Sequence, residues 1–279
     1  MPTINQLRIM GRQALKQAGI DSHIIDTDVL LMHVLNIDKN TLLINPDTPV
    51  GDDNAKIFHE MLERRRKKTP IQYIIGKCEF MSLEFAVTEN VLIPRPDTEI
   101  LVETILVKEA ASAHGLEIGI GSGCISVSLE YHSGHIKMTG VDICAKAIET
   151  AGHNQLTINS RPHNFFVSNL FENVPRGTFC FIVSNPPYIC SADIDGLEEN
   201  VKGFEPKIAL DGGVDGLEFY RKIVNQAPEY LSPRGRIYFE IGHDQADAVA
   251  KILDFAGFVN IKIAKDLAGR DRVVHGERR

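Results

Sequence analysis

The sequence predicts an α/β fold, in which a mostly parallel, Rossmann-like sheet is covered by helices and preceded by a small helical domain and a β-hairpin. Apolar residues have helical spacing over residues 4–68 and strand spacing over residues 76–92. From about residue 115 onward, short apolar runs alternate with amphipathic stretches. Because 279 residues is long for one domain, we expect a helical domain over 1–75, a hairpin connector over 76–95 and an α/β domain over 96–279.

The helical domain is predicted to contain three main helices separated by proline and glycine. The first has apolar residues at helical spacing from Leu7 onward. Asp21 is the expected N-cap of the second helix, and Asp52 or Asp53 that of the third. The basic run at 64–68 closes the third helix, where cations complement the exposed carbonyls. We therefore interpret this run as a solvated helix end.

The connector has the two-residue period of a β-hairpin. Phe80, Leu83, Phe85 and Val87 are the apolar residues that carry this period. The segment IPRPDTE at 93–99 then leads into a helix whose first turn is acidic, as suits the positive end of a helix dipole.

The α/β domain is predicted to alternate strands and helices. Such alternation favours a mostly parallel sheet with helices on both faces. Strands are expected near 115–119, 136–141, 163–167, 179–184, 235–241, 258–264 and 272–275, and helices over 122–131, 145–157, 216–230 and 245–255.

The composition limits the classes of function. The formal charge of −7 lacks the broad positive field used in non-specific nucleic-acid binding, so we expect no direct nucleic-acid substrate. The five cysteines contain no Cys-x-x-Cys pair, which indicates neither a zinc site nor a disulfide framework. The apolar stretch at 29–35 is too short to span a bilayer, and the N-terminus lacks a signal pattern. We therefore expect a cytoplasmic protein without a membrane partner.

A glycine-rich turn is the first candidate for a ligand site. In LEIGIGSGCISVSL (116–129), Gly119, Gly121 and Gly123 stand between a strand and a helix. Glycines permit positive φ and close approach of a ligand to a helix N-terminus. Asp142 ends the next strand, where its carboxylate could accept the hydroxyls of a ribose.

Two other interpretations of this turn remain open. The glycines could merely form a tight strand-to-helix turn. A dinucleotide-binding dehydrogenase would use the pattern Gly-x-Gly-x-x-Gly or Ala, and here the sixth position is Cys124. In addition, a dehydrogenase would have no known use for the Asn-Pro-Pro-Tyr motif that follows the fourth predicted strand.

That motif, VSNPPYI at 183–189, is the most specific signal in the chain. It follows an apolar strand and so is expected at the carboxyl edge of the sheet, where open α/β folds bind ligands. One reaction that this motif could serve is methylation of an amide or aryl amine. That reaction requires acceptors for both N–H hydrogens of the substrate nitrogen. Asn185 can offer its carboxamide oxygen and Pro186 its carbonyl, while Pro187 stiffens the turn and Tyr188 can supply a flat face.

On these motifs the chain resembles the amino-methyltransferases and, more closely, the HemK/PrmC family. This family uses S-adenosylmethionine to methylate N5 of the glutamine in the Gly-Gly-Gln motif of peptide chain release factors. The resemblance covers nearly the whole chain, including the segments at 63–103, 203–224 and 266–274. It implies the fold of a class I methyltransferase, a release factor as partner, and an N-terminal helical domain that helps to dock it.

The resemblance also implies roles for individual residues. Residues of the glycine turn, with Asp142, would bind the cofactor, Asn185 would touch both cofactor and substrate, and the Asn-Pro-Pro-Tyr motif would hold the glutamine amide. The implied cofactor residues are Gly119, Ile120, Gly121, Ser122, Gly123, Asp142, Asn169, Leu170 and Asn185. The implied substrate residues are Asn185, Pro186, Pro187 and Tyr188, of which Asn185, Pro186 and Tyr188 are expected to be catalytic. No metal is implied.

Two positions depart from the family pattern. Asn169-Leu170 replaces an acidic residue followed by an aromatic or a leucine, where the acid accepts from the adenine amino group, and Ile120 replaces a common threonine. Asn169 can still accept through its oxygen, so we expect an active enzyme. A DNA adenine-N6 methyltransferase and an inactive cofactor-binding scaffold remain alternatives, and Glu205 is expected to shape the acceptor loop.

Overall fold

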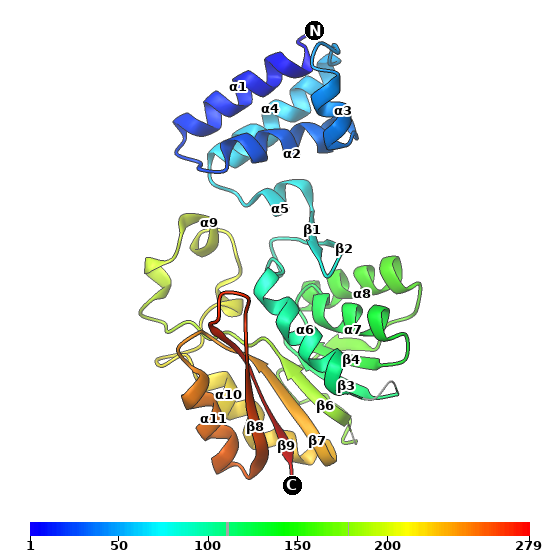
Figure 1. The fold of residues 1–279 in the computed structure, drawn as a ribbon, viewed down its shortest axis with the longest axis vertical. Helices are drawn as coiled ribbons and strands as arrows, with labels where there is room; N and C mark the ends of the chain where they lie inside the picture. The colour runs from blue at the N-terminus through cyan, green and yellow to red at the C-terminus, as the bar shows by residue number, and fades with distance from the viewer. Residues whose placement is uncertain (110–111, 178) are drawn as a thin grey trace. The chain divides into compact units, whose positions relative to one another are not determined.

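The computed structural model describes residues 1–109, 112–177 and 179–279. The chain forms two compact units (Figure 1). The first unit comprises Met1–Gly76 together with Glu198–Phe204, and the second comprises Lys77–Leu197 together with Glu205–Arg279.

The first unit is helical. Leu15, Leu30 and Phe58 are fully buried in its apolar core. Thr3 and Gln6 form a reciprocal capping box that starts the first helix. The helices are α1 (Ile4–Gln17), α2 (His23–Leu35), α3 (Lys39–Ile44), α4 (Asp52–Arg66), α5 (Ile71–Ile75) and the short α9 (Glu199–Lys202).

Three sequence-based expectations for this unit are wrong in detail. The N-cap of α2 is Ser22, one residue after Asp21. The N-cap of α4 is Gly51, so Asp52 and Asp53 lie in the first turn, where they still favour the helix dipole. The basic run is not uniformly solvated, because helical periodicity turns one of its members inward.

That member is Arg65, which is buried in the first unit. Its Nε donates to Asp26 Oδ2 at 2.7 Å, and its Nη1 donates to the carbonyl of Thr69 at 3.1 Å. A buried guanidinium is stable only when it is paired and hydrogen bonded in this way. The ion pair therefore fixes α2 against the end of α4.

The second unit contains a two-stranded hairpin and a seven-stranded sheet with the order β5-β4-β3-β6-β7-β9-β8. Strands β3 to β7 are parallel, and β9 pairs antiparallel with both β7 and β8. The strands are β1 (Lys77–Phe80), β2 (Leu83–Ala86), β3 (His114–Ile118), β4 (Lys137–Asp142), β5 (Phe165–Val167), β6 (Phe179–Ser184), β7 (Leu231–Glu240), β8 (Phe258–Lys265) and β9 (Asp271–Arg278).

Helices cover both faces of this sheet (Figure 1). Strand alternation creates two cores: Ile182 and Phe239 pack on the side of α10 and α11, while Phe181, Val183 and Tyr238 pack on the side of α6, α7 and α8. The helices are α6 (Pro96–Lys108), α7 (Cys124–Ser133), α8 (Ala145–Asn159), α10 (Glu218–Gln226) and α11 (Ala246–Phe255), with 3₁₀ turns at Ile194–Gly196, Lys207–Ala209 and Ala227–Glu229. The predicted α/β class is confirmed.

Most predicted elements of this unit lie within a few residues of their observed positions. The helix expected over 216–230 is shorter, because Pro228 converts its end into a 3₁₀ turn. The strand expected from 235 begins at Leu231. The hairpin is anchored to α8 by Asn154, whose side chain exchanges hydrogen bonds with the backbone of Ala86.

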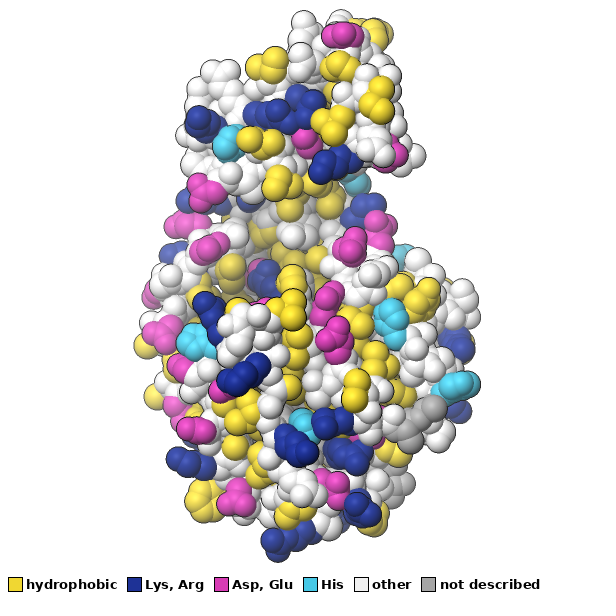
Figure 2. Space-filling model, viewed as in Figure 1, with side chains coloured by type: hydrophobic (Ala, Val, Ile, Leu, Met, Phe, Trp, Pro, Cys, Tyr) yellow, Lys and Arg dark blue, Asp and Glu magenta, His cyan; other side chains and the backbone are white. Residues whose placement is uncertain are grey.

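Two features bear on possible partners. Figure 2 shows acidic side chains interspersed with Lys and Arg over the visible face, without a continuous basic field. Among the described residues, no helix is both long and apolar enough to cross a membrane.

The strand order determines where a ligand can bind. The chain builds β3, β4 and β5 outward in one direction and then returns to place β6 and β7 on the other side of β3. At such a switch point the loops at the carboxyl ends of adjacent strands diverge and leave a crevice. The loops after β3 and β6 carry the glycine turn and the Asn-Pro-Pro-Tyr motif.

Candidate active site

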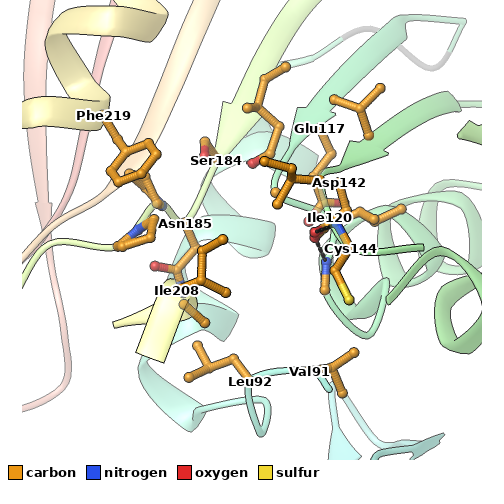
Figure 3. A pocket seen from close by; sticks show the side chains of 18 of the residues that line it. Val91, Leu92, Glu117, Ile120, Asp142, Cys144, Ser184, Asn185, Ile208 and Phe219 are labelled. Atoms are coloured by element: carbon orange, nitrogen blue, oxygen red, sulfur yellow. Dashed lines mark hydrogen bonds between the residues drawn. The ribbon is translucent and has the colours of Figure 1, made fainter. Parts of the chain in front are cut away.

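A cavity of about 280 Å³ lies at this switch point, within the second unit. In Figure 3, Asp142 and Cys144 lie on one side of it, and Asn185 and Phe219 lie on the other. The predicted site residues that line it are Gly119, Ile120, Gly121, Ser122, Asp142, Asn169, Leu170, Asn185, Pro186 and Pro187. Gly123 and Tyr188 are not among the described residues that line it.

The glycine turn owes its shape to positive φ angles. Gly119, Gly121 and Gly123 have φ of +77°, +55° and +81°, which residues with a side chain rarely adopt. A Cβ at Gly119 or Gly121 would meet no protein atom within 4 Å, whereas one at Gly123 would lie 3.0 Å from Ala151 Cβ. The first two glycines therefore leave open space beside the cavity, and the third allows α7 to pack on α8.

Asp142 holds the turn from the neighbouring strand. Its Oδ2 accepts from the Gly121 amide and its Oδ1 from the Cys144 amide, both at 2.9 Å. The amides of Gly119 and Ile120 donate to the Val141 carbonyl at 2.8 and 2.9 Å. Burial raises the pKa of Asp142 above its ordinary value, while these amides oppose the rise. The carboxylate thus organises two loops and has lone pairs left for a ligand hydroxyl.

Asn169 is oriented with its oxygen available. Its Nδ2 donates to Glu172 Oε1 at 2.8 Å, which leaves the carboxamide oxygen as an acceptor at the cavity. Leu170 beside it has a φ of +50°, an unusual conformation for a residue with a Cβ. The departure from the family pattern therefore still places an acceptor at this position.

Asn185 follows β6 and faces the cavity. Its Nδ2 donates to Thr98 Oγ1 at 3.3 Å, and its Oδ1 has no hydrogen-bond partner among the described residues. Pro186 and Pro187, which lack backbone N–H groups, continue the lining. One wall of the cavity thus presents acceptors with little competition from donors.

Tyr188 lies behind this wall. Its hydroxyl lies 3.4 Å from Glu240 Oε1, its carbonyl accepts from Gln245 Nε2 at 2.9 Å, and its ring packs on the core beneath α10. Burial raises the pKa of its hydroxyl. The role expected for Tyr188, a flat face against the acceptor group, stays a prediction.

Comparison with known proteins gives the family. The model of the PrmC N-terminal domain matches residues 6–76, and that of the methyltransferase small domain matches residues 96–197. A release factor glutamine methyltransferase of Geobacter sulfurreducens is 41% identical over 98% of this chain and 96% of its own length. One from Clostridium acetobutylicum is 38% identical over 97% of both chains. The chain belongs to the release factor glutamine methyltransferase family.

The solved structures agree with this fold. A methyltransferase from Pyrococcus furiosus superposes with a TM-score of 0.55 at 18% identity, covering 82% of this chain and 99% of that one. At that identity the likeness establishes the class I methyltransferase fold alone.

In this member of the release factor glutamine methyltransferase family, Glu117 is a cavity residue that the sequence did not reveal as functional. It is buried at the end of β3, where its Oε2 accepts from the Ser126 amide at 2.9 Å and from the Ser126 hydroxyl. Burial raises its pKa to about 8. The sequence signal that could have identified Glu117 is the presence of a charged residue inside an otherwise apolar strand.

Arg95 and Glu205 were also not paired by sequence reasoning. Arg95 lines the cavity and forms an ion pair with Glu205, which is 6% exposed. Burial raises the pKa of Glu205 and Arg95 opposes the rise. The pair ties the residues before α6 to the loop after α9.

Proposed function

We propose that this protein transfers a methyl group from S-adenosylmethionine to N5 of the glutamine side chain in the Gly-Gly-Gln motif of peptide chain release factors. The observation that carries this proposal is a single cavity in which the glycine turn and Asp142 stand opposite Asn185, whose side-chain oxygen has no hydrogen-bond partner among the described residues. Membership of the release factor glutamine methyltransferase family supplies the substrate class. Because release factors act on ribosomes, we place the reaction in the cytoplasm.

The residues of the cavity fit the cofactor. The open space before Gly119 and Gly121 admits a ligand close to the backbone, the free lone pairs of Asp142 suit the ribose hydroxyls, and the oxygen of Asn169 suits the adenine amino group. When bound, S-adenosylmethionine supplies an electrophilic methyl group on a positively charged sulfur. No described group of His, Cys, Asp and Glu residues is arranged to hold a metal.

Asn185 and Pro186 would hold the glutamine amide. The lone pair of an amide nitrogen is delocalised, so the nitrogen must be aimed and allowed to pyramidalise. Asn185 Oδ1 and the Pro186 carbonyl can each accept one N–H of the amide. After transfer, the methylated nitrogen would lose one proton, for which a weak base or water would suffice.

We further propose that the helical unit docks the release factor. A single glutamine side chain offers little surface for specificity, and remote contacts can position it for reaction. A variant lacking residues 1–76 should bind S-adenosylmethionine normally and lose about tenfold more rate on intact release factor than on a Gly-Gly-Gln peptide. Circular dichroism and cofactor titration would first establish that the variant folds; equal losses on both substrates would contradict docking.

The proposed reaction is tested by incubating the protein with labelled S-adenosylmethionine and either purified release factor or duplex DNA. We expect label only in the release factor, with the added mass on the glutamine of the Gly-Gly-Gln peptide. A release factor with that glutamine changed to alanine is the matched control. Label in DNA, or in neither substrate, would overturn the proposal.

A further inference from the structure

A chain of buried polar side chains leads from the sheet to Asn185. Asn185 Nδ2 donates to Thr98 Oγ1 at 3.3 Å. A hydrogen bond from the Thr98 side chain also lowers the pKa of the Glu240 carboxylate. Thr98 is 2% exposed in the first turn of α6, and Glu240 is 1% exposed at the end of β7. The three residues come from three different elements and meet beside the cavity.

The donors and acceptors of this chain allow one direction. An ionised carboxylate only accepts, so Glu240 requires the Thr98 hydroxyl to donate its single proton. The Thr98 oxygen can then only accept at its other side, and it accepts from an N–H of Asn185. The amide NH₂ of Asn185 is thereby turned away from the cavity, and its oxygen is turned toward it.

This orientation matters because a carboxamide is nearly symmetric in shape. Rotation by half a turn would present Asn185 Nδ2 to the substrate, and two NH₂ groups would then face each other. From these contacts, we infer that Thr98 and Glu240 are positioning residues that hold Asn185 with its oxygen toward the substrate amide. This inference rests on the proposed function, in which Asn185 Oδ1 is the acceptor.

The surroundings of Glu240 support a role beyond packing. Its Oε2 is buried without a hydrogen-bond partner among the described residues. Such an atom destabilises the folded state, so its presence favours a functional role for the carboxylate. Tyr188 Oη lies 3.4 Å from Oε1, and Arg272, which pairs with Asp97 at 2.9 Å, stabilises the charge. Burial raises the pKa of Glu240 to about 7, against the effects of Thr98 and Arg272.

Thr98 offers a matched pair of variants. Thr98→Ser keeps the hydroxyl, whereas Thr98→Val keeps the shape and removes it. With release factor as substrate, at a pH well above 7 so that Glu240 is ionised, we expect kcat to fall about tenfold or more in Thr98→Val, equivalent to about 1.4 kcal/mol of barrier. The Ser variant should stay within about threefold of the parent, and the Kd for S-adenosylmethionine should change by less than about threefold in both.

Glu240→Gln tests the direction of the chain independently. A glutamine amide can either donate to Thr98 or accept from it, so the hydrogen bonds no longer have one allowed direction and the NH₂ of Asn185 can also turn toward the cavity. We expect kcat to fall with little change in cofactor Kd, and this variant serves if Thr98→Val does not fold.

The possible failures are distinguishable. A parent protein that does not methylate release factor would overturn the proposed function itself. An active parent with equal rates in the Val and Ser variants, or with full activity in Glu240→Gln, would overturn only the positioning role.

Discussion

The two walls of the cavity are built by different means. One wall consists of the glycine turn and Asp142, which we propose bind the cofactor (the cofactor wall). Its shape depends mainly on backbone groups: three positive φ angles and amides that donate to the Val141 carbonyl and to Asp142. The other wall carries Asn185, which we propose holds the substrate amide (the acceptor wall). Its geometry depends on side chains, because hydrogen bonds link Asn185 to Thr98 and Thr98 to Glu240. Changes on the first wall should therefore weaken cofactor binding, while changes on the second should lower the rate of transfer.

The largest expected effect is on the acceptor wall. Asn185→Ala removes the oxygen that we assign to the substrate amide, and transfer should fall by roughly 100-fold or more, as for loss of one preorganised polar contact at a reacting centre. Cofactor affinity should fall much less. Single-turnover rates and calorimetry on the same preparation measure both, and turnover within a few-fold of the parent would remove Asn185 from its role.

The contrast predicts the opposite pattern on the cofactor wall. Asp142→Ala removes a charged acceptor and also frees the amides of Gly121 and Cys144, so S-adenosylmethionine should bind about 1–3 kcal/mol more weakly. Asp142→Asn keeps the size and one acceptor and should lose less. Calorimetry decides: an unchanged Kd in the alanine variant would mean that the ribose is held elsewhere.

Glu117 is a second acid on the cofactor wall, and its side chain is almost completely buried. Its folded pKa of about 8 lies above the ordinary value of 4.5, so its contribution to stability is complete below about pH 4.5 and is lost as the pH rises through 8. Glu117→Gln does not titrate. The difference in Tm, variant minus parent, should therefore increase between about pH 6 and pH 9 in thermal scans; a constant difference would contradict the raised pKa.

The smallest effect is expected at Asn169. Asn169→Asp restores the acid of the family pattern but places it against Glu172, to which Asn169 now donates. Relief of that repulsion in Asn169→Asp/Glu172→Gln should give a few-fold tighter S-adenosylmethionine binding than Asn169→Asp alone. Calorimetric Kd values in the reverse order would show that Glu172 does not face the substituted carboxylate.

Local signals in the sequence predicted much of the site. Gly119 and Asn185 each follow a strand and Asp142 ends one, and the carboxyl ends of parallel strands meet at one edge of a sheet. The positions of the strand ends therefore suffice to predict that these residues lie close together, whatever the packing of the helices. The glycine pattern also predicted the positive φ angles that the structure has.

Exact helix starts were less predictable from local signals. Several neighbouring residues can cap a helix, and Asp21 and Ser22 compete at the start of α2. Which of them caps the helix depends on the path of the chain before it. The errors at this cap and at that of α4 are of one or two residues and leave the predicted fold unchanged.

The sequence by itself determined the α/β class, the glycine turn, Asp142 and the Asn-Pro-Pro-Tyr motif, because each depends on short-range periodicity and turn chemistry. Only the tertiary structure decided the partners of those residues. Thr98 is 87 positions from Asn185, and Arg95 is 110 positions from Glu205. Such pairs form because α6 and the loop after α9 pack beside the carboxyl ends of the strands. Long-range packing of this kind produces no periodic pattern in the sequence.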